Sequence, residues 1–121
     1  MTSKKQLGKF GEQIAADYLR NNDYRIIATN YYTRAVEIDI ICEKEKVTIF
    51  VEIKTRSTQN FGWPEEAVNP SKLSHLIAAI QLYFLDQSEI TEWQIDVISI
   101  IINFANSKAK LWHFSNFNTD S

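Results

Sequence analysis

The sequence has a single cysteine in 121 residues, so it can form no internal disulfide. Cys42 also has no second cysteine with which to bind zinc, and one thiol in an apolar segment behaves as a small hydrophobic side chain. We therefore expect Cys42 to be buried and unreactive. This cysteine usage is typical of a reduced, cytoplasmic setting.

Long apolar runs are absent as well. No segment approaches the roughly 20 apolar residues that span a bilayer, and residues 1–8 contain no apolar stretch that would serve as a secretory signal. Repeats and low-complexity segments are missing too. We expect no membrane association, and one domain over residues 1–121, a length that can bury a core without metal or disulfide support.

The sequence also lacks the excess of positive charge that nucleic-acid-binding proteins usually carry, since its net charge is −2. Cations nevertheless gather in three parts of the chain: Lys4, Lys5 and Lys9; Lys54 and Arg56; and Lys108 and Lys110. The net charge argues against a dedicated high-affinity nucleic-acid binder, but it does not identify the partner.

Hydrophobic periodicity predicts seven elements. Apolar residues recur at helical spacing over residues 3–22 and again after Asn69 and Pro70, a pair typical of a helix start. The expected order is a helix (3–22), a strand (24–28), a hairpin (36–41 and 47–54), a helix from residue 70, a nearly all-apolar central strand (93–102), an edge strand (108–114) and a frayed tail (115–121). This order, α-β-β-β-α-β-β, predicts an α/β fold with a mixed sheet flanked by helices.

Residues 55–69 are the longest segment without a periodic pattern, and they include Phe61 and Trp63. A loop beside a functional site often carries substrate contacts. The alternative is a surface lid that packs its own aromatic side chains, and both interpretations remain open.

Three charged residues interrupt the apolar strands of the predicted hairpin. Asp39 lies in the run 36–41, whereas Glu52 and Lys54 lie in the run 47–54. The segment between the runs, 43–46, is charged and suits a solvated turn. Because charged side chains rarely interrupt such apolar strands, these three residues are the best candidates for chemistry.

Side chains alternate between the two faces of a strand, which fixes their placement. If the hairpin turns between residues 45 and 46, Asp39 lies opposite Glu52 and Glu37 lies opposite Lys54. Opposed Cβ atoms are roughly 4.5–5.5 Å apart, and two carboxylates that close repel unless a proton or a cation lies between them. Mg²⁺ or Mn²⁺ suits such oxygen ligands. A register slip of one residue would move Glu52 to the other face.

This arrangement resembles the restriction-endonuclease-like fold, whose PD-(D/E)xK signature is matched by Asp39, Glu52 and Lys54. Ile38 stands where the name of the signature has proline. The layout is similar to that of archaeal Holliday-junction resolvases, which also place a glutamate on the first helix, here Glu12.

More narrowly, the chain up to about residue 102 resembles the YraN-like family of uncharacterised bacterial proteins. Val36 stands where that family often has glycine, which makes the backbone entering the Asp39 strand less free. The residues that carry the resemblance are Gly8, Gly11, Glu12, Ala15, Tyr18 and Leu19; Glu37 to Ile41; Phe50 to Arg56; and Val68, Lys72, Asp96 and Val97.

The resemblance implies a metal-dependent nuclease that hydrolyses phosphodiester bonds in DNA, including branched or otherwise structured DNA. Asp39, Glu52 and the carbonyl of Ile53 would hold Mg²⁺ or Mn²⁺, with Glu12 as an auxiliary ligand. Lys54 would orient the attacking water or stabilise the transition state. The candidate phosphate contacts are Arg56, Lys72, Lys9, Lys4 and Lys5, although each of them, taken singly, also fits an ordinary surface cation. A homodimer would suit the cutting of two strands.

Other interpretations of the same residues remain open. Asp39 and Glu52 would also fit a salt-bridged strand face in which Lys54 pairs with Glu37. Glu12 would then be solvated or paired with a lysine. At the level of function, the alternatives are a nucleic-acid-binding module that does not cleave and a partner-docking protein with a vestigial site.

The remaining polar and aromatic candidates have structural interpretations. Asp96 lies on the predicted central strand and is expected to receive a hydrogen bond or an ion pair rather than a metal. His75 and His113 have no partner at ligand spacing, so we expect both to be solvated. Trp93, Trp112 and Phe114 are expected to lie in the core or on a sheet face rather than to serve as base-stacking platforms.

Overall fold

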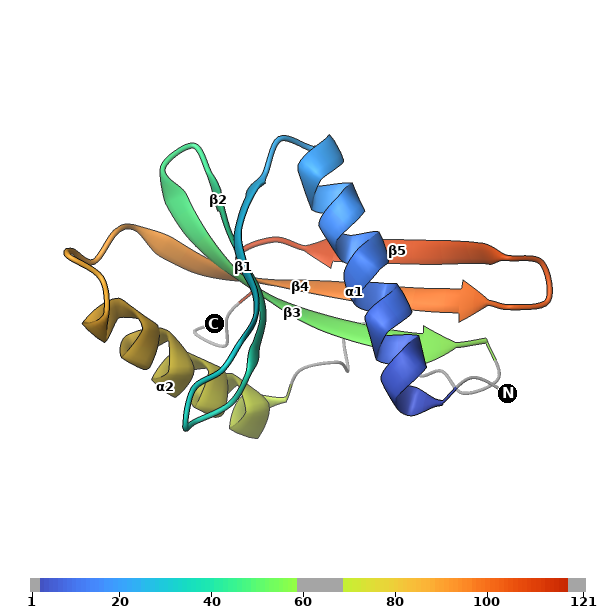
Figure 1. Cartoon of the computed structure of the whole chain (residues 1–121), viewed down its shortest axis with the longest axis horizontal. Helices are drawn as coiled ribbons and strands as arrows, with labels where there is room; N and C mark the ends of the chain where they lie inside the picture. The colour runs from blue at the N-terminus through green and yellow to red at the C-terminus, as the bar shows by residue number, and fades with distance from the viewer. Residues whose placement is uncertain (1–2, 59–68, 118–121) are drawn as a thin grey trace.

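The computed structural model describes residues 3–58 and 69–117. Its elements follow the predicted order and form an α/β fold with a five-stranded mixed sheet and two helices (Figure 1). They are α1 (Lys4–Asn21), β1 (Arg25–Tyr31), β2 (Ile38–Lys44), β3 (Val47–Ser57), α2 (Pro70–Leu85), β4 (Trp93–Asn103) and β5 (Lys108–Phe114).

The strands lie in the sheet in their chain order, β1-β2-β3-β4-β5. All neighbouring pairs are antiparallel except β3 and β4, which are parallel. Parallel neighbours need a long crossover connection, usually helical, and α2 lies within this one. As predicted, β4 has a neighbour on each side and β5 forms an edge.

Helix α1 begins with a capping box and packs on one face of the sheet. Gln6 donates its N–H to Ser3 Oγ at 3.1 Å, and Ser3 donates its N–H to Gln6 Oε1 at 3.0 Å, which satisfies two helix-end donors. The apolar stripe of α1 joins a core cluster that includes Ala15, Leu19, Ile40, Val51, Ile98 and Ile100.

Helix α2 covers part of the opposite face. Asn69 caps it by accepting the N–H of Lys72 at 2.8 Å, and Pro70 occupies its first turn, as predicted. Its core cluster includes Leu73, Leu76, Ile80, Phe50, Ile95 and Val97. Figure 1 shows α2 along one end of the sheet, while the β4–β5 hairpin extends away from it.

Strand β3 is longer than the sequence predicts and β2 begins later. Residues 55–57, predicted as loop, continue β3 because they pair with β4 as far as Ser57↔Ile102. Strand β2 begins at Ile38, so Glu37 precedes the strand. The end of β3 therefore extends past β2. The aromatic residues Phe61 and Trp63 lie outside the described residues.

The prediction of a frayed tail is wrong for residues 115–117. Phe117 donates its N–H to the Ile95 carbonyl at 2.6 Å and packs against the α2 cluster. Asn116 donates its N–H to Asp96 Oδ1 at 2.9 Å. These bonds fix the chain directly after β5, and residues 118–121 lie outside the described part.

Candidate functional site

The hairpin register that brings the two candidate carboxylates together is confirmed. Glu45 and Lys46 form the turn, with φ of 52° and 69°, the left-handed values that two-residue hairpin turns require. The ladder pairs residues 40–44 with residues 51–47. The next step of this register places Asp39 opposite Glu52.

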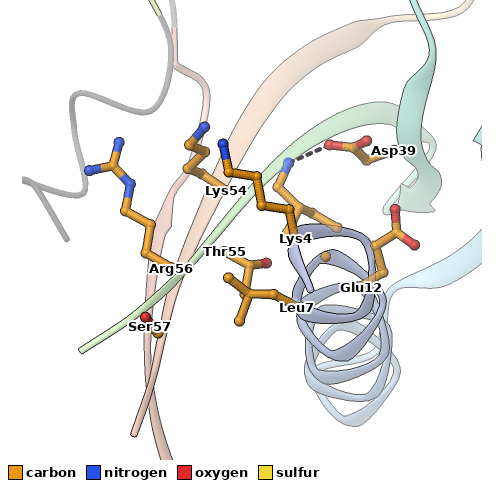
Figure 2. Close-up of a pocket in the computed structure, with 10 residues that line it drawn as sticks. Lys4, Leu7, Glu12, Asp39, Lys54, Thr55, Arg56 and Ser57 are labelled. Carbon is orange, nitrogen blue, oxygen red and sulfur yellow. Dashed lines mark hydrogen bonds between the residues drawn. The ribbon is translucent and has the colours of Figure 1, made fainter. Parts of the chain in front are cut away.

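Asp39 lies at the point where β2 begins. Its Oδ2 accepts the N–H of Ile53 at 2.7 Å, the bond marked by the dashed line in Figure 2. Burial, and then the charge of Glu52, raise the pKa of Asp39 to about 7 against this hydrogen bond. The carboxylate therefore needs a proton or a cation beside it near neutral pH.

Glu52 is 7% exposed, and its two oxygens have different surroundings. Oε1 lies 3.4 Å from the Nζ of Lys72, which reaches it from the first turn of α2. Oε2 is buried and has no hydrogen-bond partner among the described residues. Burial raises the pKa of Glu52, while the charges of Lys72 and Lys54 act in the opposite direction. An unsatisfied buried carboxylate oxygen is destabilising, so this atom is an acceptor available to a ligand.

Lys54 and Arg56 lie on one side of β3 and Thr55 on the other. Thr55 faces α1, and Figure 2 shows Lys54 and Arg56 directed away from that helix. Lys54 is exposed. The backbone N–H and C=O of one strand residue point the same way, so the Ile53 carbonyl faces the edge at which its N–H meets Asp39.

The predicted placement of Glu37 opposite Lys54 is wrong, because Glu37 precedes β2. Its Oε1 instead accepts a hydrogen bond from Asn30 Nδ2 at 2.8 Å. The same Nδ2 group donates to Glu12 Oε2 at 2.9 Å. Nothing in the sequence distinguishes Asn30 as the residue that connects α1 to this segment.

Glu12 is held near Asp39 by the close packing of α1 on β3. A Cβ atom added at Gly11 would lie 2.7 Å from Thr55 Cβ and 2.8 Å from its Cγ2, so only glycine permits this approach. The charge of Glu12 contributes to the raised pKa of Asp39, after burial and Glu52. Glu12 therefore belongs to the electrostatic surroundings of Asp39.

A cavity of about 480 Å³ opens where β3 extends past β2. Figure 2 shows it between α1 and the end of β3. Its lining residues are Lys4, Leu7, Gly8, Glu12, Asp39, Ile53, Lys54, Thr55, Arg56 and Ser57. Glu52 and Lys72 are not among them. Of the predicted phosphate contacts, Lys4 and Arg56 line the cavity, while Lys5 and Lys9 are exposed on α1 and do not.

The donor set for a cation consists of two carboxylates and one carbonyl. In residues 3–58 and 69–117, no cluster of three or more histidine, cysteine or acidic side chains is arranged around a metal position. Mg²⁺ needs only one or two carboxylates, because it keeps several waters and takes substrate phosphates as ligands. Asp39, Glu52 with its unpaired Oε2, and the Ile53 carbonyl fit this requirement.

Asp96 and His113 form a separate, structural pair. His113 Nε2 lies 2.7 Å from Asp96 Oδ2, and its Nδ1 lies 2.7 Å from Tyr18 Oη. Hydrogen bonds from His113, Asn116 and Gln94 lower the pKa of Asp96 against its burial. The structural prediction for Asp96 is confirmed. The prediction that His113 is solvated is wrong, because α1 packs over β5; His75 is exposed, as predicted.

No helix within the described residues is long and apolar enough to cross a bilayer.

Comparison with known proteins identifies close relatives over nearly the whole chain. The protein is 42% identical over 113 residues to a UPF0102 protein of Syntrophomonas wolfei, covering 93% of this chain and 96% of that one. It is 40% identical to a UPF0102 protein of Alkaliphilus oremlandii, covering 93% and 97%. A relative from Caldicellulosiruptor bescii is 39% identical, covering 88% and 92%. The family profile described as Uncharacterised protein family UPF0102 matches residues 11–100. The chain therefore belongs to the UPF0102 family, which confirms the predicted YraN-like family.

Proposed function

We propose that this protein is a divalent-metal-dependent nuclease that hydrolyses phosphodiester bonds in DNA. The observation that carries the proposal is the carboxylate pair beside an open cavity lined with cations: Asp39 is half-buried and Glu52 is buried. A pair of such acids with raised pKa values and an unpaired oxygen destabilises the fold, which favours a functional reason for its presence.

Each residue of the site has a distinct task in this proposal. Asp39, Glu52 and the Ile53 carbonyl would bind the cation, and the ammonium of Lys72 beside Glu52 favours the ionised form of that carboxyl, which lowers its pKa against the effect of burial. When bound, Mg²⁺ or Mn²⁺ supplies charge neutralisation at the phosphate and a more acidic water. Lys54 lies at the cavity and stabilises the charge that develops on the phosphate oxygens in the transition state. The attacking water loses a proton and bonds to phosphorus as the bond to the leaving sugar oxygen breaks, and that oxygen takes up a proton to become a hydroxyl.

Asp39 adds a pH dependence to cation binding. With its pKa near 7, this side chain holds a proton in part of the molecules at neutral pH, and the cation must displace that proton. Cation affinity is therefore expected to rise with pH through about 7 and to level off above it.

The element order and the charged trio of Asp39, Glu52 and Lys54 also support placement in the PD-(D/E)xK superfamily. The likeness extends to Glu12 on the first helix, which lies close enough to act on the pKa of Asp39. The names of the UPF0102 relatives state no activity, so the proposal depends on the site itself.

The test is cleavage of end-labelled duplex, single-stranded, flapped and four-way DNA in Mn²⁺. Wild type is expected to cut at least one of these forms, and EDTA is expected to abolish cutting. Lys54→Ala should cut roughly 100-fold more slowly, the cost of removing one group that stabilises the transition state. Lys46→Ala, in the exposed hairpin turn, removes the same charge away from the site and should cut like wild type.

Three results would overturn the proposal. Binding of these DNAs without cleavage would favour the module that binds but does not cut. Cleavage that persists undiminished in Lys54→Ala and Asp39→Asn would indicate a contaminating nuclease. Neither binding nor cleavage of any form would favour the partner-docking alternative.

A further inference from the structure

The face of the sheet that carries Lys54 is only partly covered by α2. The α2 core cluster includes Phe50 on β3 and ends at Val97 on β4. Ile101 lies two strand repeats further along β4, and neither it nor Trp112 on β5 belongs to either core cluster. Among the described residues, the sheet beyond α2 thus presents apolar side chains on a surface that no helix covers.

Strand pairing arranges the side chains of this surface in rows. Lys54 pairs with Ser99, which pairs with Trp112 across β4 and β5. In the next row, Arg56 pairs with Ile101, which pairs with Lys110. Adjacent strands lie ~4.8 Å apart and alternate residues ~6.7 Å apart along a strand. The backbones at Lys54 and Trp112, two strands apart, are therefore separated by roughly 10 Å across the sheet.

The charge of this surface differs from that of the whole protein. Lys54, Arg56, Lys110 and Lys108 all lie on it, the last paired with Asn103 in the row that follows. No acidic residue occurs among positions 54–58 at the end of β3, positions 99–103 of β4 or positions 108–112 of β5. Although the protein has a net charge of −2, this surface therefore has a local positive charge that would attract a polyanion.

A groove of about 460 Å³ lies on the same surface. It is lined by Thr58, Ile101, Asn103, Asn106, Lys108, Lys110 and Trp112. Ile101, one of the residues that line the groove, pairs with Arg56, and Arg56 lines the cavity that also includes Asp39. The groove and the candidate active site therefore meet at β3.

We propose that the groove on β4 and β5 binds single-stranded DNA and leads it to the Asp39 cavity. Lys108 and Lys110 contact the phosphates, and an unpaired base stacks on the indole of Trp112, the combination that characterises single-strand binding surfaces. A fully paired duplex cannot offer its base faces to Trp112. The choice of DNA depends on the proposed nuclease function, whereas the single-strand preference depends on Trp112.

The test measures binding of fluorescein-labelled oligothymidine by anisotropy in EDTA, so that no cleavage is involved. For wild type, the logarithm of affinity should fall linearly with the logarithm of salt concentration. Lys108→Ala with Lys110→Ala should reduce that slope by ~1.4, because each phosphate that a lysine neutralises contributes ~0.7. The matched control, Arg20→Ala with Lys46→Ala, removes the same charge from exposed positions elsewhere and should leave the slope unchanged.

The stacking part of the proposal is tested at Trp112. Trp112→Leu should weaken binding roughly 5- to 100-fold, whereas Trp112→Phe, which keeps an aromatic ring, should recover much of the loss. Circular dichroism and urea unfolding establish that each variant is folded. A blunt duplex of equal length should bind more weakly than the single strand to wild type.

Several results would overturn this inference. One is an equal reduction of the salt slope by the Lys108→Ala, Lys110→Ala double variant and by its control. The others are binding by Trp112→Leu that equals that of wild type, and wild-type binding of the duplex as tight as that of the single strand. Tighter binding of the corresponding RNA would also contradict it. The cleavage assay separates this inference from the proposed function. If the variants at Lys108, Lys110 and Trp112 bind single strands more weakly but wild type cleaves no DNA, the groove binds single-stranded DNA and the proposed nuclease function is refuted. If wild type cleaves DNA but these variants bind single strands as tightly as wild type, the nuclease function is supported and the role of the groove is refuted.

Discussion

Replacing Asp39 with asparagine should make the protein more stable at pH 8 than wild type. Asparagine is nearly isosteric and its Oδ1 can still accept the N–H of Ile53, which Asp39 accepts at 2.7 Å. What the substitution removes is a half-buried negative charge beside Glu52. Burial and that neighbouring charge raise the pKa of Asp39 from 3.8 to about 7, so the ionised form is the unfavourable one in the folded protein.

The raised pKa sets both the sign and the size of the effect. Between pH 4 and pH 7 the unfolded chain has released the Asp39 proton while the folded protein still holds it. The free energy of unfolding of wild type therefore falls as pH rises through this window. The difference between about 7 and 3.8 amounts to ~4 kcal/mol at ~1.4 kcal/mol per pKa unit. Asp39→Asn should lack this loss and exceed wild type by ~2–4 kcal/mol at pH 8.

The assay is urea unfolding, followed by circular dichroism, at pH 4.5, 6 and 8 in EDTA. Asp17→Asn is the matched control, because Asp17 is an exposed carboxylate on α1 and its removal should leave the pH dependence parallel to that of wild type. The reasoning is refuted if Asp39→Asn is less stable than wild type at pH 8, or if the two proteins lose stability in parallel as pH rises.

Two further predictions concern the close approach of α1 to β3 and the buried carboxylate of Asp96. Gly11→Ala should destabilise the protein by ~1–3 kcal/mol in urea unfolding, because the new Cβ meets Thr55. Gly8→Ala has no atom within 4 Å and should stabilise it by up to ~1 kcal/mol; equal effects of the two would contradict the proposed close approach. His113→Phe should cost ~3 kcal/mol, because it removes the imidazole from Oδ2 of the fully buried Asp96 and leaves only the hydrogen bonds from Gln94 and Asn116 to the other oxygen. Adding Asp96→Asn should recover part of that loss, and no recovery would show that the ring, not the charge, matters.

The hairpin illustrates how much of the site can be predicted from sequence. A charged two-residue turn and strict alternation of faces fix the register, and this register places Asp39 opposite Glu52. This register depends only on the two strands and the turn between them. The prediction fails at Glu37 because it assumes that the strand extends two residues further than it does.

Contacts made through the crossover could not be predicted in this way. Lys72 reaches Glu52 because α2 returns over the sheet after β3. The hydrophobic periodicity of α2 and of β3 does not indicate that these two side chains meet. The pairing of His113 with Asp96 likewise depends on α1 packing over β5, where Tyr18 meets the imidazole. Periodicity identifies the buried face of an element but not which charged residues two faces bring together.

The central claim is that Asp39 and Glu52 together hold one divalent cation, and Mn²⁺ titration by calorimetry at pH 7.5 tests it most directly. Wild type and Asp17→Asn are expected to bind one Mn²⁺ with the same affinity. Asp39→Asn and Glu52→Gln should each bind at least ~10-fold more weakly, because each removes one of the two charged ligands. Mn²⁺ binding by both site variants as tight as that of wild type would contradict the account.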